Sequence, residues 1–325
     1  MRVFSGARPT GRQHIGNYLG AIRNYAELQE EYECIYCIVD VHALTTMEDA
    51  LSTSRIQSNI QEMMLDWLAC GLDPQKSILF VQSRVPEVLE LHTFLSMITP
   101  LGWLLRVPTF KEKVRVQPHN VNYGLVGYPV LQAADIVLYK AELVPVGEDQ
   151  LPHLELAREI ARRFNNIFGY TFPEPEAKLT NLPLVLGLDG EQKMSKSLGN
   201  DIELASSPKE TEERVMTAVT DPARRYLSDP GHPDICNIFR LHHFFNSEGV
   251  EEIARACPEA HIGCVECKKM LAGRMNACLA PMRERRENLA RKPQYIREIL
   301  DHGAERARII ACATLGEVKH KIGLT

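Results

Sequence analysis

Neither a long hydrophobic run nor an excess of one charge is found in this sequence of 325 residues. No apolar stretch approaches the roughly 20 residues that a membrane-spanning helix needs. The first residues, MRVFSGARPTG, also lack the charged-then-apolar pattern of a signal peptide. We therefore expect a cytoplasmic protein that contacts no membrane. The net charge of −5 gives no global attraction to nucleic acid, so any RNA would have to bind a local basic surface.

The cysteine count also argues against a disulfide-stabilised fold. Nine is an odd number, and in a cytosolic chain it indicates thiols or metal ligands rather than disulfides. The apolar content of 45% and the charged content of 24% are ordinary for a globular enzyme. A chain of this length can bury a substantial core, and we expect two domains.

Short apolar runs alternate with helical patterns in the first half of the chain. The runs that read as strands are residues 2–5, 34–39, 77–82 and 143–146. Between the first two, Leu19, Ile22 and Ala26 share one helical face, and a wider apolar stripe runs from Ile56 to Leu68. This alternation predicts a parallel sheet with helices on both sides, whose ligands bind at the carboxyl ends of the strands.

The strand pattern fades after about residue 200, and polar helical stretches replace it. They cover residues 208–219, 248–256, 265–290 and 294–313. We therefore expect an α/β protein with two parts. Residues 1–198 would form a Rossmann-type parallel-sheet domain, and residues 199–325 a mostly α-helical domain.

A glycine-rich turn follows the first predicted strand. Gly6 and the segment Pro9-Thr10-Gly11 precede His14-Ile15-Gly16-Asn17, which opens a helix. Glycines let backbone approach a phosphate closely, and a helix N-terminus offers free N–H groups. His14 and Asn17 lie three residues apart on one helical face, so both could donate to the same phosphate.

A second candidate phosphate-binding segment stands far downstream. Residues 193–197, Lys-Met-Ser-Lys-Ser, follow the turn Leu188-Asp189-Gly190. Two lysines and two hydroxyl groups on a mobile loop suit a pyrophosphate leaving group whose charge grows in the transition state. Taken alone, either segment is more often an ordinary turn or solvated loop. The two together, in this order on a parallel α/β background, favour a nucleotide site.

The paired motifs resemble the HIGH and KMSKS signatures of class I aminoacyl-tRNA synthetases. The first motif ends in Asn17 rather than histidine, which is the form common in the tryptophan branch of that family. Further blocks that resemble bacterial tryptophanyl-tRNA synthetases are residues 16–21, 39–45, 109–113, 128–139, 145–150 and 218–224. The resemblance implies activation of L-tryptophan by ATP and Mg²⁺, transfer of tryptophan to tRNA, and a homodimer.

The resemblance also implies an amino-acid pocket around Asp135. In the family the matching aspartate accepts the indole N–H, and indole is only a donor, so a carboxylate suits it. Leu131 and Ile136 crowd Asp135, which favours a buried role over an ordinary helix-surface carboxylate. Phe4, Val39 and Ile136 would form the apolar wall. The other residues expected at this pocket are Gly6, His42, Tyr128, Gln132 and Gln150.

The ATP site is implied in the same way. Gly147, Glu148 and Asp149 would hold the ribose, Val185 would meet the adenine, and Lys111 and Lys113 would reach towards the phosphates. The whole ATP-binding set is Arg8, Pro9, Thr10, Gly16, Asn17, Gly147, Glu148, Asp149, Val185, Lys193, Met194, Ser195, Lys196 and Ser197. The residues expected to act on the reacting phosphates are His14, Asn17, Lys113, Lys193 and Lys196. Positioning and charge stabilisation would carry the reaction without a covalent nucleophile.

The downstream cysteines form a metal-type pattern. Cys257, Cys264 and Cys267 have spacings of six and two intervening residues, and Cys236 is a candidate fourth thiolate. Four thiolates suit zinc or an iron–sulfur cluster, and the spacing does not decide between them. The quartet resembles that of a subset of bacterial tryptophan enzymes with a [4Fe–4S] cluster in the anticodon-binding domain. Beside it, Lys268, Lys269 and Arg274 would offer a basic platform for RNA.

The remaining cysteines are expected to be structural. Cys34 and Cys37 are three residues apart on a predicted strand, so they should point to opposite faces. The other three, Cys70, Cys278 and Cys312, lie in helical patterns and read as small core residues.

Two alternative functions stay open from the residues. Gln132 stands where many tryptophan enzymes have methionine, and a glutamine one turn before an aspartate is similar to the tyrosine enzymes, although the cluster-bearing subset also has glutamine there. A catalytically silent RNA-binding paralogue is the other alternative, against which the intact Lys193 and Lys196 argue.

Overall fold

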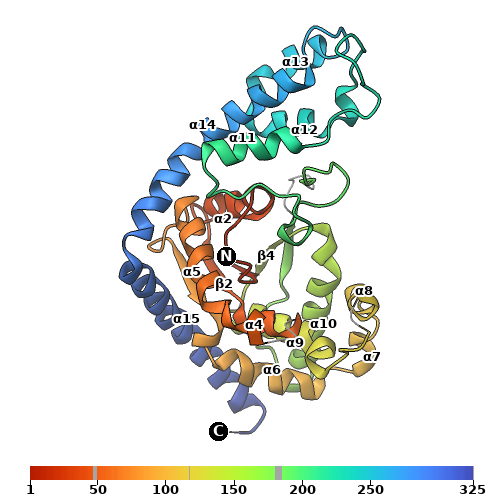
Figure 1. The fold of residues 1–325 in the computed structure, drawn as a ribbon. Coiled ribbons are helices and arrows are strands. Elements are labelled where there is room, and N and C mark those ends of the chain that lie inside the picture. Colours follow the sequence, from red (N-terminus) through yellow and green to blue (C-terminus); the bar gives the residue numbers. More distant parts are fainter. Residues whose placement is uncertain (47–49, 117, 180–184, 325) are drawn as a thin grey trace.

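The computed structural model describes residues 1–46, 50–116, 118–179 and 185–324 (Figure 1). Figure 1 shows the earlier part of the chain, from red to light green, gathered around the strands. The helices α11, α12 and α13 lie beyond this body at one end of the long helix α14, and α15 runs back along it. Within the described segments, no helix is long and apolar enough to cross a membrane.

A sheet of five parallel strands forms the centre of the larger body. The strands are β1 (Arg2–Ala7), β2 (Glu33–Ile38), β3 (Ser77–Val81), β4 (Leu143–Val146) and β5 (Glu176–Leu179). Their order in the sheet is β3-β2-β1-β4-β5. The order reverses between β1 and β4, which is where such folds bind ligands. Four of the strands confirm the sequence prediction. The fifth was missed because it is an edge strand, Glu-Ala-Lys-Leu, without an apolar run.

Helices cover both faces of the sheet, as the alternating pattern predicted. In β2, Cys34, Tyr36 and Ile38 pack into one hydrophobic core with α5 and α14. The intervening residues Ile35 and Cys37 pack into the other core with α6, α9 and α10. This period of two confirms that Cys34 and Cys37 point to opposite faces.

The helices have the following bounds. The α-helices are α1 (Ile15–Asn17), α2 (Arg23–Leu28), α3 (Asp40–Ala43), α4 (Ala50–Ser54), α5 (Ile56–Ala69), α6 (Glu87–Ile98), α7 (Leu101–Leu104), α8 (Pro108–Val116), α9 (Tyr123–Leu138), α10 (Leu151–Phe168), α11 (Pro208–Thr217), α12 (Asn237–Phe245), α13 (Val250–Ala256), α14 (Cys264–Ala290) and α15 (Pro293–Lys321). A π-helical turn, η1 (Tyr18–Ile22), joins α1 to α2. The 3₁₀ turns are η2 (Leu44–Thr46), η3 (Gln82–Arg84), η4 (Glu148–Gln150), η5 (Lys196–Leu198), η6 (Pro233–Ile235) and η7 (Ser247–Gly249).

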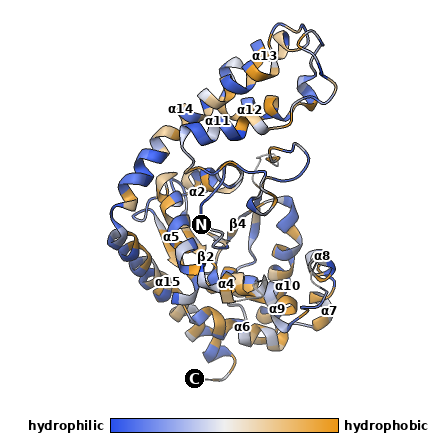
Figure 2. Ribbon diagram, in the orientation of Figure 1, coloured by the Kyte–Doolittle hydropathy of each residue, from blue (hydrophilic) through white to orange (hydrophobic). Residues whose placement is uncertain are grey.

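The second half of the chain is helical, as expected, but its last helix returns to the sheet. Ala304, Ala307 and Ala311 of α15 lie in the core that α6 and α9 form on one face of the sheet. The approach is close, since a Cβ atom at Gly303 would overlap the carbonyl oxygen of Leu79 in β3. In Figure 2 orange, apolar ribbon is concentrated around α6, α9 and the strands. The division at residue 198 stays a prediction, and α15 packs with the sheet.

Candidate active site

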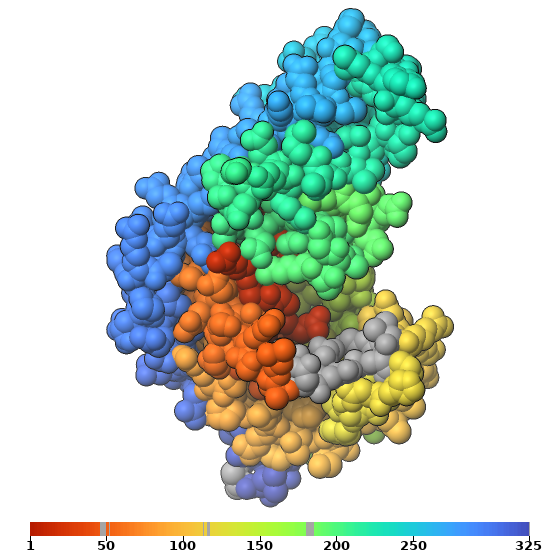
Figure 3. All heavy atoms as spheres, viewed as in Figure 1, coloured from red at the N-terminus to blue at the C-terminus, as the bar shows by residue number. Residues whose placement is uncertain are grey.

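A cavity of about 1020 Å³ opens at the carboxyl end of the sheet, near β1 and β4. In Figure 3 the N-terminal atoms (red) are visible in a recess between the orange and the green parts of the molecule. The volume suits a small-molecule site, which usually occupies about 300–1,000 Å³. The expected residues that line it are Phe4, Gly6, Arg8, His14, Gly16, Asn17, Val39, His42, Tyr128, Gln132, Asp135, Ile136, Gly147, Glu148, Asp149, Gln150, Val185, Lys193 and Met194.

Other expected residues lie outside this lining. Among the residues that the structure describes, these are Pro9, Thr10, Lys111, Ser195, Lys196 and Ser197. Lys113 belongs to α8, but its side chain lies outside the described part of the chain. The structure therefore brings most of the predicted set to one cavity, and their individual roles stay predictions.

The two nucleotide motifs are joined by backbone hydrogen bonds. The N–H of Ile15 donates to the carbonyl of Ile202 at 2.9 Å, and the N–H of Leu204 donates to the carbonyl of Gln13 at 2.9 Å. The segment that follows the KMSKS motif thus pairs with the segment that opens α1. Because both motifs are held by this pairing, groups about 180 residues apart in sequence converge on one end of the cavity.

His14 and Asn17 form a capping box at the start of α1. The backbone N–H of Asn17 donates to Nδ1 of His14 at 3.2 Å, and the backbone N–H of His14 donates to Oδ1 of Asn17 at 3.1 Å. Since Nδ1 accepts, the proton of a neutral His14 ring is on Nε2, where it can be donated to a phosphate. Burial, together with the charges of Lys196 and Lys193, lowers the pKa of His14 to about 4, against the opposing effect of Asp201. His14 is therefore a neutral donor at pH 7.

The KMSKS segment is held in place by Asn200, which the sequence analysis missed. Oδ1 of Asn200 accepts from the N–H of Ser195 at 2.7 Å, while its Nδ2 donates to Oδ2 of Asp189 at 2.6 Å. A Cβ atom at Gly187 would overlap the side-chain amide of Asn200, so a larger residue there would displace the hydrogen-bonded amide. A polar side chain directly after the motif was the available signal.

Asp135 on α9 is buried at the other end of the cavity. Nε2 of Gln82 donates to both of its carboxylate oxygens, at 2.9 and 2.7 Å. Oε1 of Gln82 accepts the backbone N–H of His42 at 3.1 Å, which fixes the orientation of the amide. Burial, with a smaller contribution from the charge of Asp40, raises the pKa of Asp135 to about 8, although the Gln82 hydrogen bond opposes the shift. The arrangement presents a desolvated acceptor to a ligand that carries a donor.

Gln82 was another residue that the sequence analysis missed. It ends the predicted strand 77–82 and begins η3, at the carboxyl edge of the sheet where ligand-binding side chains are expected. A polar residue at the end of a fully buried strand was the signal for it. It positions Asp135 rather than lining the cavity itself.

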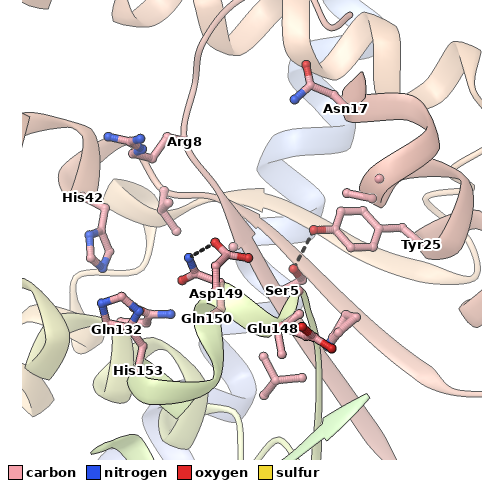
Figure 4. A pocket seen from close by; sticks show the side chains of 18 of the residues that line it. Ser5, Arg8, Asn17, Tyr25, His42, Gln132, Glu148, Asp149, Gln150 and His153 are labelled. Carbon is pink, nitrogen blue, oxygen red and sulfur yellow. Dashed lines mark hydrogen bonds between the residues drawn. The ribbon is translucent and has the colours of Figure 1, made fainter. Parts of the chain in front are cut away.

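Two hydroxyl groups and one imidazole ring form a second hydrogen-bonded cluster in the wall of the cavity, at the end that holds Asp135; we call this the amino-acid end. The hydroxyl of Tyr128 lies 2.7 Å from Oγ1 of Thr109 and 2.9 Å from Nε2 of His153. Thr109 belongs to α8 and His153 to α10, so the cluster joins α8, α9 and α10 across the cavity wall. Figure 4 shows His42, Gln132 and His153 on the same side of the cavity. His153 was not predicted, because only the tertiary fold brings α10 here.

The end of β4 supplies the remaining polar groups. Gly147 leads into η4, and Oδ2 of Asp149 accepts from Nε2 of Gln150 at 2.8 Å, as the dashed line in Figure 4 shows. A Cβ atom at Gly147 would lie 2.7 Å from Oδ1 of Asp149, so a larger residue there would displace this carboxylate. Carboxylates at this edge can accept hydrogen bonds from ribose hydroxyl groups.

The four downstream cysteines line one small pocket in the helical body. Cys236 precedes α12, Cys257 follows α13, and Cys264 and Cys267 lie in the first turn of α14. Burial, followed by the electrostatic effect of the neighbouring cysteines, raises the pKa of Cys267 to about 12. Nε2 of His242 lies 3.3 Å from its Sγ atom. In the described part of the chain, no group of three or more His, Cys, Asp or Glu residues has the geometry of a metal site.

Two expectations about residues outside the quartet were wrong. Cys278 and Cys312 are exposed, whereas Cys70 is buried as predicted. A helical pattern does not show which face of α14 or α15 meets the solvent, and these two thiols are on the outer one. Lys268, expected to form part of a basic platform, donates from Nζ to the carbonyl of Met216 at 2.9 Å, while Lys269 is exposed.

Comparisons with known proteins agree with this geometry. The family described as tRNA synthetases class I (W and Y) matches residues 1–280. The chain is 46% identical to the tryptophan–tRNA ligase of Thermotoga maritima over 100% of this chain and 99% of that one. It is 45% identical to that of Deinococcus radiodurans over 99% and 98% of the two chains. The solved Campylobacter jejuni tryptophanyl-tRNA synthetase, complexed with ADP and tryptophan, is 39% identical over all of both chains, with a TM-score of 0.89. The chain therefore belongs to the tryptophanyl-tRNA synthetases, within the class I tRNA synthetases.

Proposed function

We propose that this protein joins L-tryptophan to ATP, forming tryptophanyl-adenylate and pyrophosphate, and then transfers tryptophan to the 3′ end of its tRNA. The observation that carries this proposal is the buried carboxylate of Asp135 in a cavity that also holds both nucleotide motifs. Indole has one N–H donor and no acceptor, so it matches an acceptor held by Gln82. Full-length similarity to tryptophan–tRNA ligases supports the same choice.

The two steps need no nucleophile from the protein. The tryptophan carboxylate attacks the α-phosphorus, the bond to the β-phosphate oxygen breaks, and pyrophosphate leaves with Mg²⁺. A ribose hydroxyl of the terminal tRNA nucleotide then attacks the activated carbonyl, and AMP leaves. His14 would donate from Nε2 to a phosphate, and Lys193 and Lys196 would stabilise the charge that develops on pyrophosphate. Positioning by α9 and the end of β4 would supply the remaining acceleration.

Pyrophosphate exchange tests the first step. Purified protein with ATP, Mg²⁺ and labelled pyrophosphate should form labelled ATP with tryptophan and far more slowly with tyrosine. Exchange with tyrosine alone would assign the chain to tyrosine, the alternative that Gln132 raises. Exchange with neither amino acid would indicate a silent RNA-binding paralogue. Charging of tRNA from the same reaction tests the second step.

We also propose that Cys236, Cys257, Cys264 and Cys267 hold a [4Fe–4S] cluster, with zinc as the alternative metal. The support is that the four side chains line one pocket, and soft thiolates suit either group. Nε2 of His242 and Nη1 of Arg224 lie 3.3 and 3.8 Å from the Sγ atoms of Cys267 and Cys257, where they can donate to ligand sulfurs. When bound, the group would supply rigidity to the loops that precede α12 and α14.

We further propose that the protein acts in the cytoplasm as a homodimer. Large apolar side chains are exposed on α6 and α7, where Met97 is 77% and Leu101 is 60% accessible, and Leu105 directly follows. Apolar surface of this kind is typical of a protein–protein contact. Light scattering during size-exclusion chromatography should give twice the chain mass of 36.7 kDa, and the substitutions Met97→Glu and Leu101→Glu together should give the monomer mass.

A further inference from the structure

Lys196, the second lysine of the KMSKS motif, is not among the described residues that line the cavity, and its ammonium group contacts Thr10 and Glu203. Its Nζ atom lies 3.3 Å from the carbonyl oxygen of Thr10, to which it donates, and 3.6 Å from Oε1 of Glu203. Among the described residues that line the cavity, Lys193 is present and Lys196 is not. The positive charge of Lys196, which the proposed reaction needs, is therefore paired with the carboxylate of Glu203 on the same segment.

Glu203 is itself held from a second side. Its Oε2 atom lies 3.5 Å from Nη1 of Arg12, so the two carboxylate oxygens face two different cations. The backbone around Glu203 also pairs with His14 in an antiparallel bridge. The bridge holds the Glu203 carboxylate beside the end of the cavity that contains His14 and Lys193, which we call the phosphate end. It does so whether or not Lys196 is paired with Glu203.

The second cation is anchored to the helical body. Nε of Arg12 donates to Oε2 of Glu62 at 2.8 Å, and the same oxygen accepts from Nη2 of Arg286 on α14. Nε of Arg286 donates to Oδ1 of the buried Asp66 at 2.6 Å, whose Oδ2 accepts the N–H of Gln13. The position of Glu203 is therefore tied, through Arg12, to the helix that begins at Cys264.

The physical consequence concerns competition between anions. The polyphosphate of ATP carries several negative charges, and Lys196 can neutralise it only after leaving Glu203. A pair with both side chains about one third exposed is weak enough to exchange partners, because such pairs contribute little to stability. A like charge on Glu203 beside the incoming phosphates adds to the cost of binding.

We infer that Glu203 is a latch that holds Lys196 away from ATP in the nucleotide-free enzyme. The inference rests on the proposed function, since it concerns the ATP that this site would bind. It assigns to Glu203 the role of a positioning residue that sets nucleotide affinity and touches no reacting atom. Release of Lys196 is then coupled to nucleotide entry, so that the lysine meets the polyphosphate only when ATP is present.

Calorimetric titration of Mg·ATP, without tryptophan, tests the latch. The substitution Glu203→Gln should lower the Kd of Mg·ATP about threefold to fivefold, the factor expected when one exposed ion pair no longer competes. In a Lys196→Ala background, the same substitution should change the Kd by less than about 1.5-fold, with remaining through-space repulsion screened by about 0.15 M salt. The matched control is Glu213→Gln, an exposed acid on α11 that pairs with Lys209, and it should leave the Kd unchanged.

The outcomes separate the latch from the proposed function. A wild-type protein that does not bind Mg·ATP contradicts the proposed function itself. Wild-type binding with an unchanged or raised Kd in folded Glu203→Gln overturns the latch alone, as does an equal gain in the Lys196→Ala background. Circular dichroism checks folding. If Glu203→Gln does not fold, Glu203→Asp replaces it, because its carboxylate is one methylene shorter and its pairing with Lys196 is weakened, which should also tighten binding.

Discussion

The two ends of the cavity hold their polar groups in different ways. At the amino-acid end, Asp135 is 2% exposed and both of its oxygens accept hydrogen bonds from Gln82. At the phosphate end, Lys196 and Glu203 keep 31% and 32% of their side chains exposed and pair at 3.6 Å. The carboxylate at the amino-acid end is buried and held by short hydrogen bonds, whereas the charged groups at the phosphate end are partly exposed and held by weak ion pairs.

This difference matches two kinds of ligand. A buried acceptor costs free energy unless a donor satisfies it, so a ligand that lacks the donor is strongly rejected. Exposed ion pairs distinguish ligands poorly, but they exchange partners at little cost and follow charge as it moves during a reaction. The amino-acid end is therefore suited to selecting a side chain, and the phosphate end to stabilising a transition state.

The largest effect is expected at the buried end. Asp135→Ala should lower kcat/KM for tryptophan in pyrophosphate exchange by on the order of 10³ to 10⁴, because the indole N–H loses its acceptor. The Kd of Mg·ATP should stay within about twofold of wild type, since binding of the phosphates depends on the other end of the cavity. Exchange and calorimetry measure the two quantities. Unchanged exchange kinetics with tryptophan would remove Asp135 from the pocket.

At the exposed end, Lys196→Ala should lower kcat for adenylate formation by about 10²-fold, the usual loss for a group that stabilises transition-state charge. The Kd of tryptophan should not change, because Asp135 and its partners are untouched. Rapid-quench measurement of adenylate gives the rate, and Lys209→Ala, an exposed lysine on α11, is the control. An increase in KM with an intact kcat would mean that Lys196 binds substrate and transition state equally.

The pH dependence of tryptophan affinity sharpens the comparison further. The pKa of Asp135 is raised to about 8 in the empty pocket, so the carboxyl group is mostly protonated at pH 7. An indole donor favours the ionised form, and affinity should therefore rise with pH and level off above the raised pKa. We expect binding about 25-fold weaker near pH 6.5 than near pH 8.5, the ratio of the ionised fractions of a group with a pKa of about 8. Calorimetry should show this slope in the wild type and not in Asp135→Asn. An equal slope in both proteins would assign the titration to another group.

The smallest effect on adenylate synthesis is expected from the cysteine pocket. Cys264→Ser should abolish retention of iron, about four atoms per chain in protein purified without oxygen, and lower tRNA charging about threefold to tenfold. Pyrophosphate exchange should stay within about twofold, because the pocket lies at the far end of α14. Cys278→Ser, an exposed thiol on the same helix, is the control. Stoichiometric zinc without iron would contradict the cluster, and loss of exchange in folded protein would contradict the separation.

The sequence predicted the residues at the phosphate end, but it did not predict Glu203, the residue that pairs with Lys196 there. His14, Asn17 and Lys193 lie in contiguous motifs, so their convergence on one cavity followed from two short segments. Glu203 carries no motif, and its contacts with Lys196 and Arg12 depend on how the segment after residue 200 folds back on residues 13–15. A contiguous pattern shows which groups can bind phosphate. It does not show which neighbour competes for them.

At the amino-acid end, too, the sequence predicted the residue that lies in a contiguous block and missed those that only the tertiary fold brings close. Asp135 follows from the resemblance of residues 128–139, and its burial from the apolar residues beside it in α9. Gln82 directly follows β3 and His153 lies in α10, and only the tertiary fold places them beside α9. Strand β5 and the packing of α15 against the sheet were missed for a similar reason. The residues of each segment do not show which other part of the chain it packs against.

The most direct test of the contrast between the two ends compares tryptophan with β-(3-benzothienyl)alanine, which has sulfur in place of the indole nitrogen and no N–H. The measured quantity is the ratio of kcat/KM for the two amino acids in pyrophosphate exchange. We predict a ratio of about 10³ or more in the wild type, because the analogue leaves a buried acceptor unsatisfied. In Asp135→Ala, which has no acceptor, the ratio should fall to within about tenfold of unity. A ratio that is equally large in both proteins would contradict recognition through Asp135.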